Sequence, residues 1–584
     1  MKRLARSLAR SLALAMIAGA LMGVSPAKQE IPSAAHSTHG SGFHRGHSMR
    51  AMLVMSASVV NAAAVQKVPL YDGLGSLNFP VTTVSPDAQR YFSQGLAFAY
   101  GFNHAAAIAS FREAQRLDPR CAMCWWGEAF AHGPNINAPM DAAANARAVS
   151  AASSAHWLAR NATPAERALT AAMVKRYSLD PNADRAALDA SFADEMLATA
   201  AAHPAHDDIA LLAAEAAMNT KPWDYWTADK KPNARIGEAV RLVETVLARS
   251  PRHPQAAHLY IHLMENGPDP KLAEAAADRL DAPLAPTLGH LVHMPAHIYY
   301  RLGRWQDSIR ANVAAARADE AWISDSGDKG LVRYGYYPHN VHFIVMSAQM
   351  AGEMPTAIRE ARKLETILDP GTSSKIAWIQ AVNAAPYFAA AQFATPAEIL
   401  AMRAPDTRLP YPTAIRFYAR AVARAQQRNR VGFERELQRL RAVRNSDALK
   451  PMIAQGVPAD DLLHLAEAVA RARWASANGR LGDAVRLYHE AVGIEQKIPY
   501  MEPPYWYYPV HQSLGAALYR AGRYREASKA FETALSQSPN NGWILYGLAA
   551  SERALGRRAQ ATAADAALKK AWSGNPHWLR MDRL

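Results

Sequence analysis

Apolar residues recur at a fixed spacing near both ends of the chain, with small and large side chains in a regular order. Near the start these residues are Tyr91, Gly95, Phe98, Ala107, Phe111, Ala114 and Pro119. Near the end the same order returns at Leu514, Gly515, Leu518, Ala527, Phe531, Ala534 and Pro539. Small residues let two helices touch, and large residues fill the gaps beside them. The pattern therefore predicts pairs of antiparallel helices.

Further units continue this pattern along the chain. A repeat of this type has a period of about 34 residues. One period after the first complete unit the pattern resumes at Trp125 and Ala129, and one period after the last it resumes at Leu548 and Ala561. Weaker copies occupy residues 239–364, where an insertion at 322–337 interrupts them. Each unit buries its apolar face only against its neighbours. We therefore expect an all-α superhelix of tetratricopeptide type, with one solenoid over residues 81–400 and a C-terminal one over 401–584.

Composition supports helices throughout. Half of the 584 residues are hydrophobic and glycine is sparse, which favours helices over strands. The formal net charge of +14 includes four basic residues near the N-terminus. No basic helix with interleaved aromatic residues is present, so we expect no nucleic-acid partner.

The N-terminal residues predict export. Lys2, Arg3, Arg6 and Arg10 precede an apolar run at 12–24 and small residues at 25–27, which is typical of a signal peptide over residues 1–27. The run is too short for a stable membrane anchor. Residues 28–80 are expected to be disordered or to form a second leader-like segment. The mature protein is predicted to be periplasmic or secreted.

Five short segments add a family resemblance to the repeat pattern. They are residues 121–127 (CAMCWWG), 133–137 (GPNIN), 293–297 (HMPAH), 339–343 (HNVHF) and 502–509 (EPPYWYYP). With the repeats, they resemble a group of exported bacterial proteins in the tetratricopeptide-repeat superfamily. The resemblance implies a scaffold that binds a protein or peptide in a concave groove. In that superfamily the groove is lined by the second, fifth and ninth positions of each unit's first helix.

Histidines occupy most of those positions in three consecutive units. Seven of the 21 histidines fall within 85 residues, and Gln255 and Met346 hold the other two groove positions. The seven are His258, His262, His290, His293, His297, His339 and His342. Adjacent helices pack about 8 to 10 Å apart, which brings matching positions together. The sequence therefore predicts a histidine-lined groove.

Three interpretations of these histidines remain open. Several convergent imidazoles suit zinc, copper or nickel, and the thioether of Met346 would favour copper. Alternatively, the histidines form a polar groove and bond to Tyr299, Tyr300, Glu265 or a partner peptide. A buried structural role is the third interpretation.

Known catalytic signatures do not support a specific enzyme. His258 and His262 have the spacing of a zinc-protease helix, but Leu259 stands where that mechanism needs glutamate. No phosphate-binding loop, nucleophile elbow or dinucleotide motif is found, so no nucleotide cofactor is expected. The alternative function is a copper- or zinc-dependent enzyme acting on a small molecule in the groove.

Cys121 and Cys124 are the only cysteines of the chain. Trp125 stands where a covalent haem motif requires histidine, so haem is not expected. In an oxidising compartment the pair is predicted to form a disulfide, with soft-metal ligation as the alternative. Residues 133–140 and 503–509 are candidates for the walls of a site, or for packing under neighbouring loops.

Overall fold

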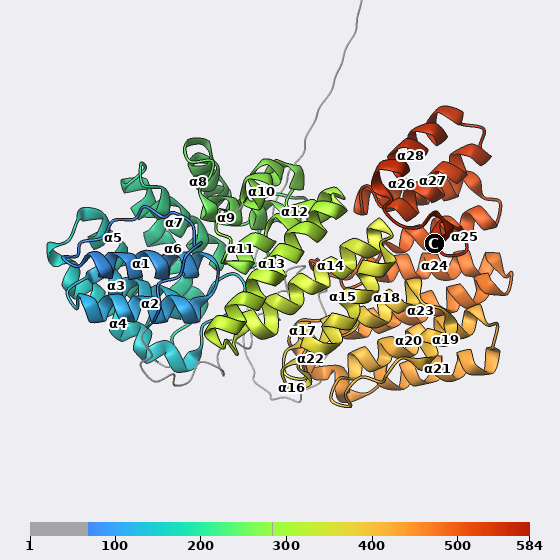
Figure 1. The fold of residues 1–584 in the computed structure, drawn as a ribbon, viewed down its shortest axis with the longest axis horizontal. Coiled ribbons are helices and arrows are strands. Elements are labelled where there is room, and N and C mark those ends of the chain that lie inside the picture. The colour runs from blue at the N-terminus through green and yellow to red at the C-terminus, as the bar shows by residue number, and fades with distance from the viewer. Residues whose placement is uncertain (1–67, 181, 283) are drawn as a thin grey trace, which may run out of the picture. The chain divides into compact units, whose positions relative to one another are not determined.

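The computed structural model describes residues 68–584 except 181 and 283. The predicted signal peptide and most of the predicted disordered segment lie outside these residues. The first helices, drawn from blue to green in Figure 1, are α1(Pro86–Tyr100), α2(His104–Leu117), α3(Ala122–His132), α4(Asn145–Leu158), α5(Pro164–Lys175), α6(Arg185–Ala202), α7(Asp207–Asn219), α8(Ile236–Arg249), α9(Pro254–Met264) and α10(Glu274–Asp281).

The central helices follow in green and yellow. They are α11(Gly289–His293), α12(Pro295–Leu302), α13(Trp305–Ser326), α14(Tyr337–Ala351), α15(Met354–Ile367), α16(Pro370–Ser373), α17(Ala377–Val382), α18(Ala385–Phe393) and α19(Pro396–Ala401). A π-helical turn, η5(Val332–Tyr336), precedes α14. It falls within the insertion predicted at residues 322–337. The first residues of that insertion, 322–326, belong to α13.

The C-terminal helices complete the chain. They are α20(Pro410–Gln426), α21(Arg430–Arg444), α22(Lys450–Ala454), α23(Ala459–Ala477), α24(Leu481–Glu495), α25(Val510–Arg520), α26(Tyr524–Gln537), α27(Gly542–Ala554) and α28(Arg558–Ala571). Short 3-10 turns are η2(Ala142–Ala144), η3(Ala159–Asn161), η4(Pro270–Ala273), η6(Asp447–Leu449) and η7(Pro576–Trp578). Within the described ranges there is no strand, only two isolated bridges. The all-α repeat fold is therefore confirmed.

Two phenylalanines show why the apolar spacing folds as it does. Phe111 of α2 lies against both Gly95 of α1 and Gly127 of α3, where a Cβ atom would come within 2.7 and 2.3 Å of its ring. Phe531 of α26 lies in the same way against Gly515 and Gly547. A glycine on each neighbouring helix is thus needed to admit the ring. The regular spacing of small and large residues in the sequence is therefore explained by this contact between a phenylalanine ring and two glycines.

Buried side chains form two main cores. One extends from Leu74 to Tyr336 and the other from Trp223 to Leu584, so the two overlap in sequence around the central helices. The domain boundary predicted near residue 400 falls between α19 and α20, inside the second core. Helices α20 and α18 pack against each other across that boundary.

Residues 68–80 differ from the disorder expected for residues 28–80. Leu74 and Phe79 are buried, and Phe79 packs on Phe92 of α1. The Tyr71 amide donates a hydrogen bond to Gln94 Oε1, and the Tyr91 hydroxyl donates one to the carbonyl of Val68. Apolar side chains and hydrogen bonds between its backbone and side chains of α1 thus hold this extended segment on α1.

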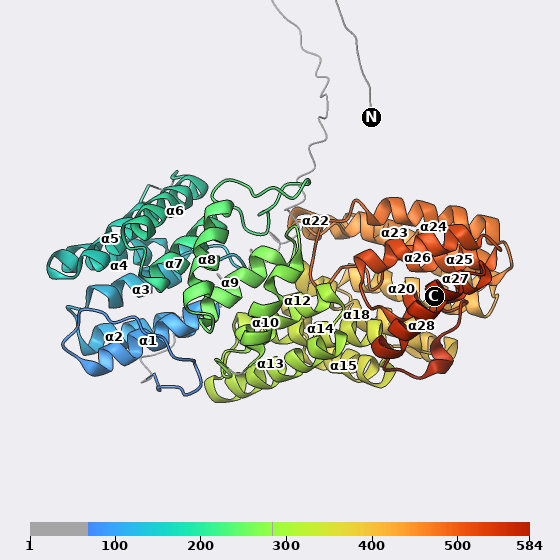
Figure 2. The same cartoon turned by 90° about the horizontal axis from the view of Figure 1, so that it is seen from above.

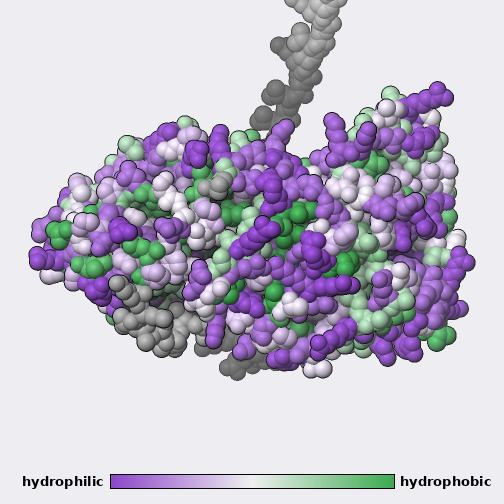
Figure 3. Space-filling view, viewed as in Figure 1, coloured by the Kyte–Doolittle hydropathy of each residue, from purple (hydrophilic) through white to green (hydrophobic). Residues whose placement is uncertain are grey.

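The face of the protein drawn in Figure 3 is mainly hydrophilic. On the face drawn in Figure 3, hydrophobic residues form separate patches among polar ones. Among the described residues, no helix has the length and apolar character needed to cross a bilayer.

Candidate metal centre

Four central helices bring six histidines together. His258 and His262 lie on α9, His290 and His293 on α11, His297 on α12 and His339 on α14. These helices lie between the N-terminal and C-terminal helices in both views (Figure 1, Figure 2). Pro295 has no amide hydrogen, and the helix is interrupted at Met294 between α11 and α12.

The six histidines separate into two sets of three. In the first set, one ring nitrogen from each of His258, His262 and His290 lies within 4.8 Å of the others. His258 Nε2 and His290 Nε2 are 3.2 Å apart. We call this set the first triad.

The second triad consists of His293, His297 and His339, whose ring nitrogens also lie within 4.8 Å of one another. Here His293 Nε2 and His297 Nε2 are only 2.8 Å apart. The four-residue spacing places both rings on one face of the helix despite its interruption.

The two triads are direct neighbours. Ring centroids of His262 and His297 are 5.7 Å apart, and those of His290 and His293 are 6.1 Å apart. Within the triads the centroid distances run from 4.6 to 6.0 Å. The six rings therefore form one continuous cluster, which we call the histidine cluster.

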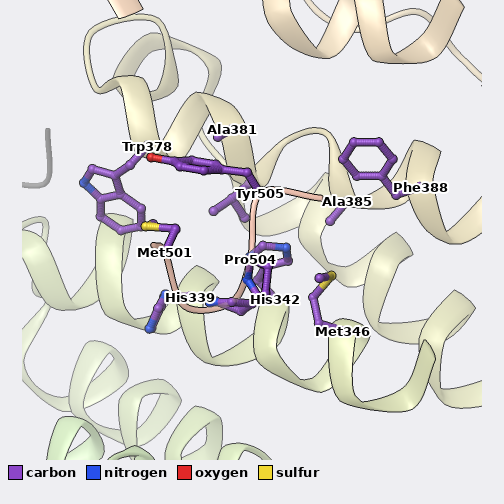
Figure 4. A pocket seen from close by; sticks show the side chains of 12 residues that line it. His339, His342, Met346, Trp378, Ala381, Ala385, Phe388, Met501, Pro504 and Tyr505 are labelled. Atoms are coloured by element: carbon purple, nitrogen blue, oxygen red, sulfur yellow. The ribbon is translucent and has the colours of Figure 1, made fainter. Parts of the chain in front are cut away.

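His342 lies outside both triads. With His339 it lines a small cavity of about 20 Å³, bounded on the other side by the connection between α24 and α25 (residues 496–509). Figure 4 shows His339, His342 and Met346 along α14, with Met501, Pro504 and Tyr505 of the connection across from them. Met346 lines this cavity together with His339 and His342.

Outer partners fix the orientation of the rings. His258 Nδ1 lies 2.9 Å from Gln255 Oε1, and His293 Nδ1 lies 2.7 Å from Asn312 Oδ1. The Asn312 amide nitrogen donates a hydrogen bond to the Ser308 carbonyl, so the Asn312 amide oxygen faces the His293 ring. Oxygen acceptors at Nδ1 leave Nε2 as the nitrogen with a free lone pair. This is the arrangement that metal-binding histidines commonly have.

Glu265 connects the two triads. Its Oε1 lies 2.8 Å from His262 Nδ1, and its Oε2 lies 2.8 Å from His297 Nδ1. Tyr500, from the α24–α25 connection, donates a hydrogen bond to the same Oε2. The carboxyl group is fully buried, yet His297 and His262 hold its pKa below the usual value against the opposing effect of burial. Glu265 is therefore an ionised carboxylate shared by both triads.

Burial disfavours the charged form of most of these imidazoles. It lowers the pKa of His258, His290, His293 and His339 well below 6.5, and neighbouring histidines add to the effect. Burial also lowers the pKa of His262, and that of His342 to about 4. Neutral imidazole is the form that binds metal.

The expected open groove is not observed. None of the six triad histidines is more than 5% exposed. Phe102 packs on His258 with ring centroids 4.7 Å apart, and Tyr336 packs on His290 at 4.6 Å. The groove positions were assigned correctly to one face, but residues distant in sequence cover that face. The interpretation as a polar groove open to a peptide is therefore wrong for these side chains.

Some partners were predicted and others were missed. Glu265 contacts the cluster as one interpretation expected, whereas the Tyr299 hydroxyl bonds to Asp278 and faces away. Asn312, Tyr500 and Phe102 were not anticipated. Asn312 has a local signal, because it is a buried amide in an alanine-rich helix, but Tyr500 is separated from Glu265 by 235 residues.

The two candidate wall segments also contact the cluster region. Residues 133–140 form a loop after α3, and the Ile136 carbonyl accepts a hydrogen bond from Trp223, whose ring meets His262 edge-on at 4.9 Å. Tyr505, Trp506, Tyr507 and Tyr508 are buried in the second core, while Pro503, Pro504 and Tyr505 line the cavity beside His339. Both segments thus support the site from outside.

Cys121 and Cys124 lie apart from the cluster at the start of α3. Their sulfur atoms are bonded to each other in the structure, and both side chains are buried. They take no part in either triad.

Comparisons with known proteins agree with the repeat fold. A tetratricopeptide repeat family model matches residues 508–541, which include α25 and α26. No curated protein matches the sequence. Among solved structures, a human IFIT1 dimer with PPP-AAAA is similar at 12% identity and a TM-score of 0.30, covering 84% of this chain and 91% of that one. Yeast Tom70 is similar at 11% identity and a TM-score of 0.26, covering 85% of this chain and 94% of that one. The chain thus carries a recognisable tetratricopeptide repeat within an all-helical repeat fold.

Proposed function

We propose that this protein binds transition-metal ions in the histidine cluster, one ion in each triad. Copper and zinc are the candidates, because imidazole nitrogen suits both. No carboxylate belongs to either triad, so magnesium and calcium, which prefer oxygen ligands, fit less well.

One contact carries this proposal: His293 Nε2 and His297 Nε2 face each other at 2.8 Å. A hydrogen bond between them would need a proton on one Nε2. However, His293 Nδ1 faces an amide oxygen and His297 Nδ1 faces the Glu265 carboxylate, and both are acceptors. An N–H at each Nδ1, directed at these acceptors, leaves the two Nε2 lone pairs pointing at each other. A shared cation would convert this repulsion into two bonds.

The first triad supports the same conclusion. His258 Nδ1 faces Gln255 Oε1, which leaves its Nε2 lone pair directed at His290. In the described part of the chain, His262 Nε2 is buried without a hydrogen-bond partner. An unsatisfied buried nitrogen costs about 1 to 3 kcal/mol, and metal ligation would remove that cost.

The alternative of a metal-dependent enzyme is weaker. The cavity beside His339 and another beside His290 each measure about 20 Å³. A buried water needs about 10 to 15 Å³ by this measure, so each cavity suits a solvent-sized ligand and not an organic substrate. The proposed role is therefore metal binding by an exported repeat scaffold, periplasmic or secreted, whose surface outside the cluster is free to bind a protein or peptide partner.

Metal stoichiometry tests the proposal. Purified full-length protein loaded with Cu(II) or Zn(II) and desalted should retain about two ions per chain by elemental analysis. His293→Gln with His297→Gln removes two ligands of the second triad only and should reduce the content to about one ion. The matched control is His156→Gln with His577→Gln, because both of these histidines are exposed.

Two outcomes would overturn the proposal. Parent protein that retains no stoichiometric ion would favour the buried structural role, with a protonated His297 beside Glu265. Parent and double variant that retain equal amounts of metal would place the ion elsewhere in the chain.

A further inference from the structure

A second site lies in the C-terminal helices, far along the chain from the histidine cluster. A cavity of about 360 Å³ is bounded by α20, α23, α25 and the last five residues of the chain. Cavities that hold small organic ligands usually measure about 300 to 1,000 Å³. We call it the arginine cavity, because five arginines line it: Arg428, Arg473, Arg520, Arg580 and Arg583.

Positive charge exceeds negative charge around this cavity. Asp582 is the acidic side chain among the lining residues, and it pairs with Arg580 at 2.6 Å. Over residues 68–584, apart from 181 and 283, no carboxylate lies within 4.0 Å of the guanidinium nitrogens of Arg428, Arg473, Arg520 or Arg583. Burial and the nearby Arg580 lower the pKa of Arg583, which agrees with this excess.

Arg473 is the residue that most requires an anion. Its Nη2 lies 3.4 Å from the Tyr508 hydroxyl, and its Nε is buried with no hydrogen-bond partner among the described atoms. A guanidinium group does not lose its proton in proteins, so it cannot avoid the cost of burial by becoming neutral. Leaving a buried charge unpaired is strongly destabilising, and a bound anion would offset this cost.

A backbone oxygen at this wall shows the kind of group that fits. The Ser513 hydroxyl donates a hydrogen bond of 2.6 Å to the carbonyl oxygen of Leu584, at the wall of the cavity. Ser513 also contacts the Tyr508 hydroxyl at 3.0 Å, which links this wall to Arg473. An oxygen acceptor is thus already accommodated beside the arginines. Apolar atoms of Val422, Ala516 and Met581 line the remaining wall, as an organic ligand requires.

We propose that the arginine cavity binds a small organic anion with two or more carboxylate groups. The arginines come from four different segments around the cavity, so they match a ligand whose charges are distributed over its length. Arg473 binds one carboxylate on the inner wall. Arg428 and Arg520 bind another at the opening. This site is independent of the histidine cluster and of any metal bound there.

Calorimetric titration with tricarballylate tests the site, since this tricarboxylate has no hydroxyl group to assist metal chelation. Metal-free full-length protein at low salt should bind one tricarballylate, and its trimethyl ester should not bind. Loss of one arginine contact should weaken binding at least about tenfold, so Arg520→Gln is the main variant. Arg558→Gln, on exposed α28, is the matched control and should bind like the parent. Raising the salt concentration should weaken binding in the parent.

A second variant separates binding from folding. Arg473→Gln should abolish tricarballylate binding while preserving the helical circular dichroism spectrum, because Arg473 is only partly buried and forms no ion pair within the described residues. The proposal fails if the parent does not bind tricarballylate at low salt. It also fails if Arg520→Gln and Arg558→Gln bind it equally, or if inorganic phosphate binds more tightly than tricarballylate.

Discussion

The histidine cluster and the arginine cavity solve the same electrostatic problem in opposite ways. Both gather side chains of one kind from several segments of the chain. Six imidazoles approach to centroid distances of 4.6 to 6.1 Å, and burial disfavours the charged form of His258, His262, His290, His293 and His339. Guanidinium groups cannot be neutralised in this way, and the five arginines surround an open volume of about 360 Å³. Titratable groups can thus be packed together, whereas permanently charged groups must be held apart.

Of the experiments that compare the two sites, metal removal should have the largest effect on the stability of the protein. A ligand present at 100 times its dissociation constant stabilises the folded state by about 2.7 kcal/mol per site, so two ions contribute about 5 kcal/mol. We expect chelation to lower the thermal unfolding temperature of the metal-loaded parent accordingly. Tricarballylate affinity should not change on chelation. A parallel loss of tricarballylate binding would show that the two sites are coupled.

Acid should affect the histidine cluster and leave the arginine cavity unchanged. Imidazoles with a lowered folded-state pKa bind fewer protons than in the unfolded chain, so stability is complete above about pH 6.5 and falls as the pH decreases towards the folded-state value. For His342, with a pKa of about 4, this loss is on the order of 2 to 3 kcal/mol. Denaturant unfolding of metal-free protein between pH 7 and 4 measures it.

The control for this experiment is His342→Gln. This variant should reduce the pH dependence of the free energy of unfolding by the contribution of one imidazole. Tricarballylate affinity has to be compared above the range in which the ligand itself is protonated. A metal-free protein whose free energy of unfolding is constant from pH 7 to 4 would contradict the neutral state assigned to the buried rings.

Glu265→Gln should give a smaller effect that sharpens the comparison within the histidine cluster. An outer carboxylate partner typically contributes about 10- to 100-fold to metal affinity. Because Glu265 contacts one histidine of each triad, both ions should bind more weakly in this variant. Competition titrations with a chelator measure the two affinities. The control is Glu244→Gln, an exposed carboxylate that accepts from Tyr260 on α9. Weakening of only one ion would show that the carboxylate does not serve both triads.

The sequence was sufficient for the helices and named six histidines that the structure brings together, with His342 as a seventh that lies outside the triads. Gly95, Phe111 and Gly127 are local signals, since the ring and the two glycines meet across adjacent helices. The repeat register likewise placed the histidines on one inner face. It did not separate His342 from the triads, because that depends on how far α14 is rotated against α12.

Burial of the cluster could not be predicted from the repeat register. The register describes contacts between neighbouring units, whereas Phe102 and Tyr500 reach the cluster from distant parts of the chain. The arginine cavity was missed for the same reason. Arg473 and Ser513 lie on neighbouring inner helices, but Leu584 closes the wall from the end of the chain.

The contact between Tyr500 and Glu265 has a consequence for how the chain folds. Repeat arrays usually fold through local contacts, which close quickly, but this contact closes a loop of 235 residues. A chain emerges from synthesis with its N-terminal part first. All six triad histidines are therefore made well before Tyr500. We expect closure by the α24–α25 connection to be a late step, which completes the cover that Phe102 and Tyr336 begin.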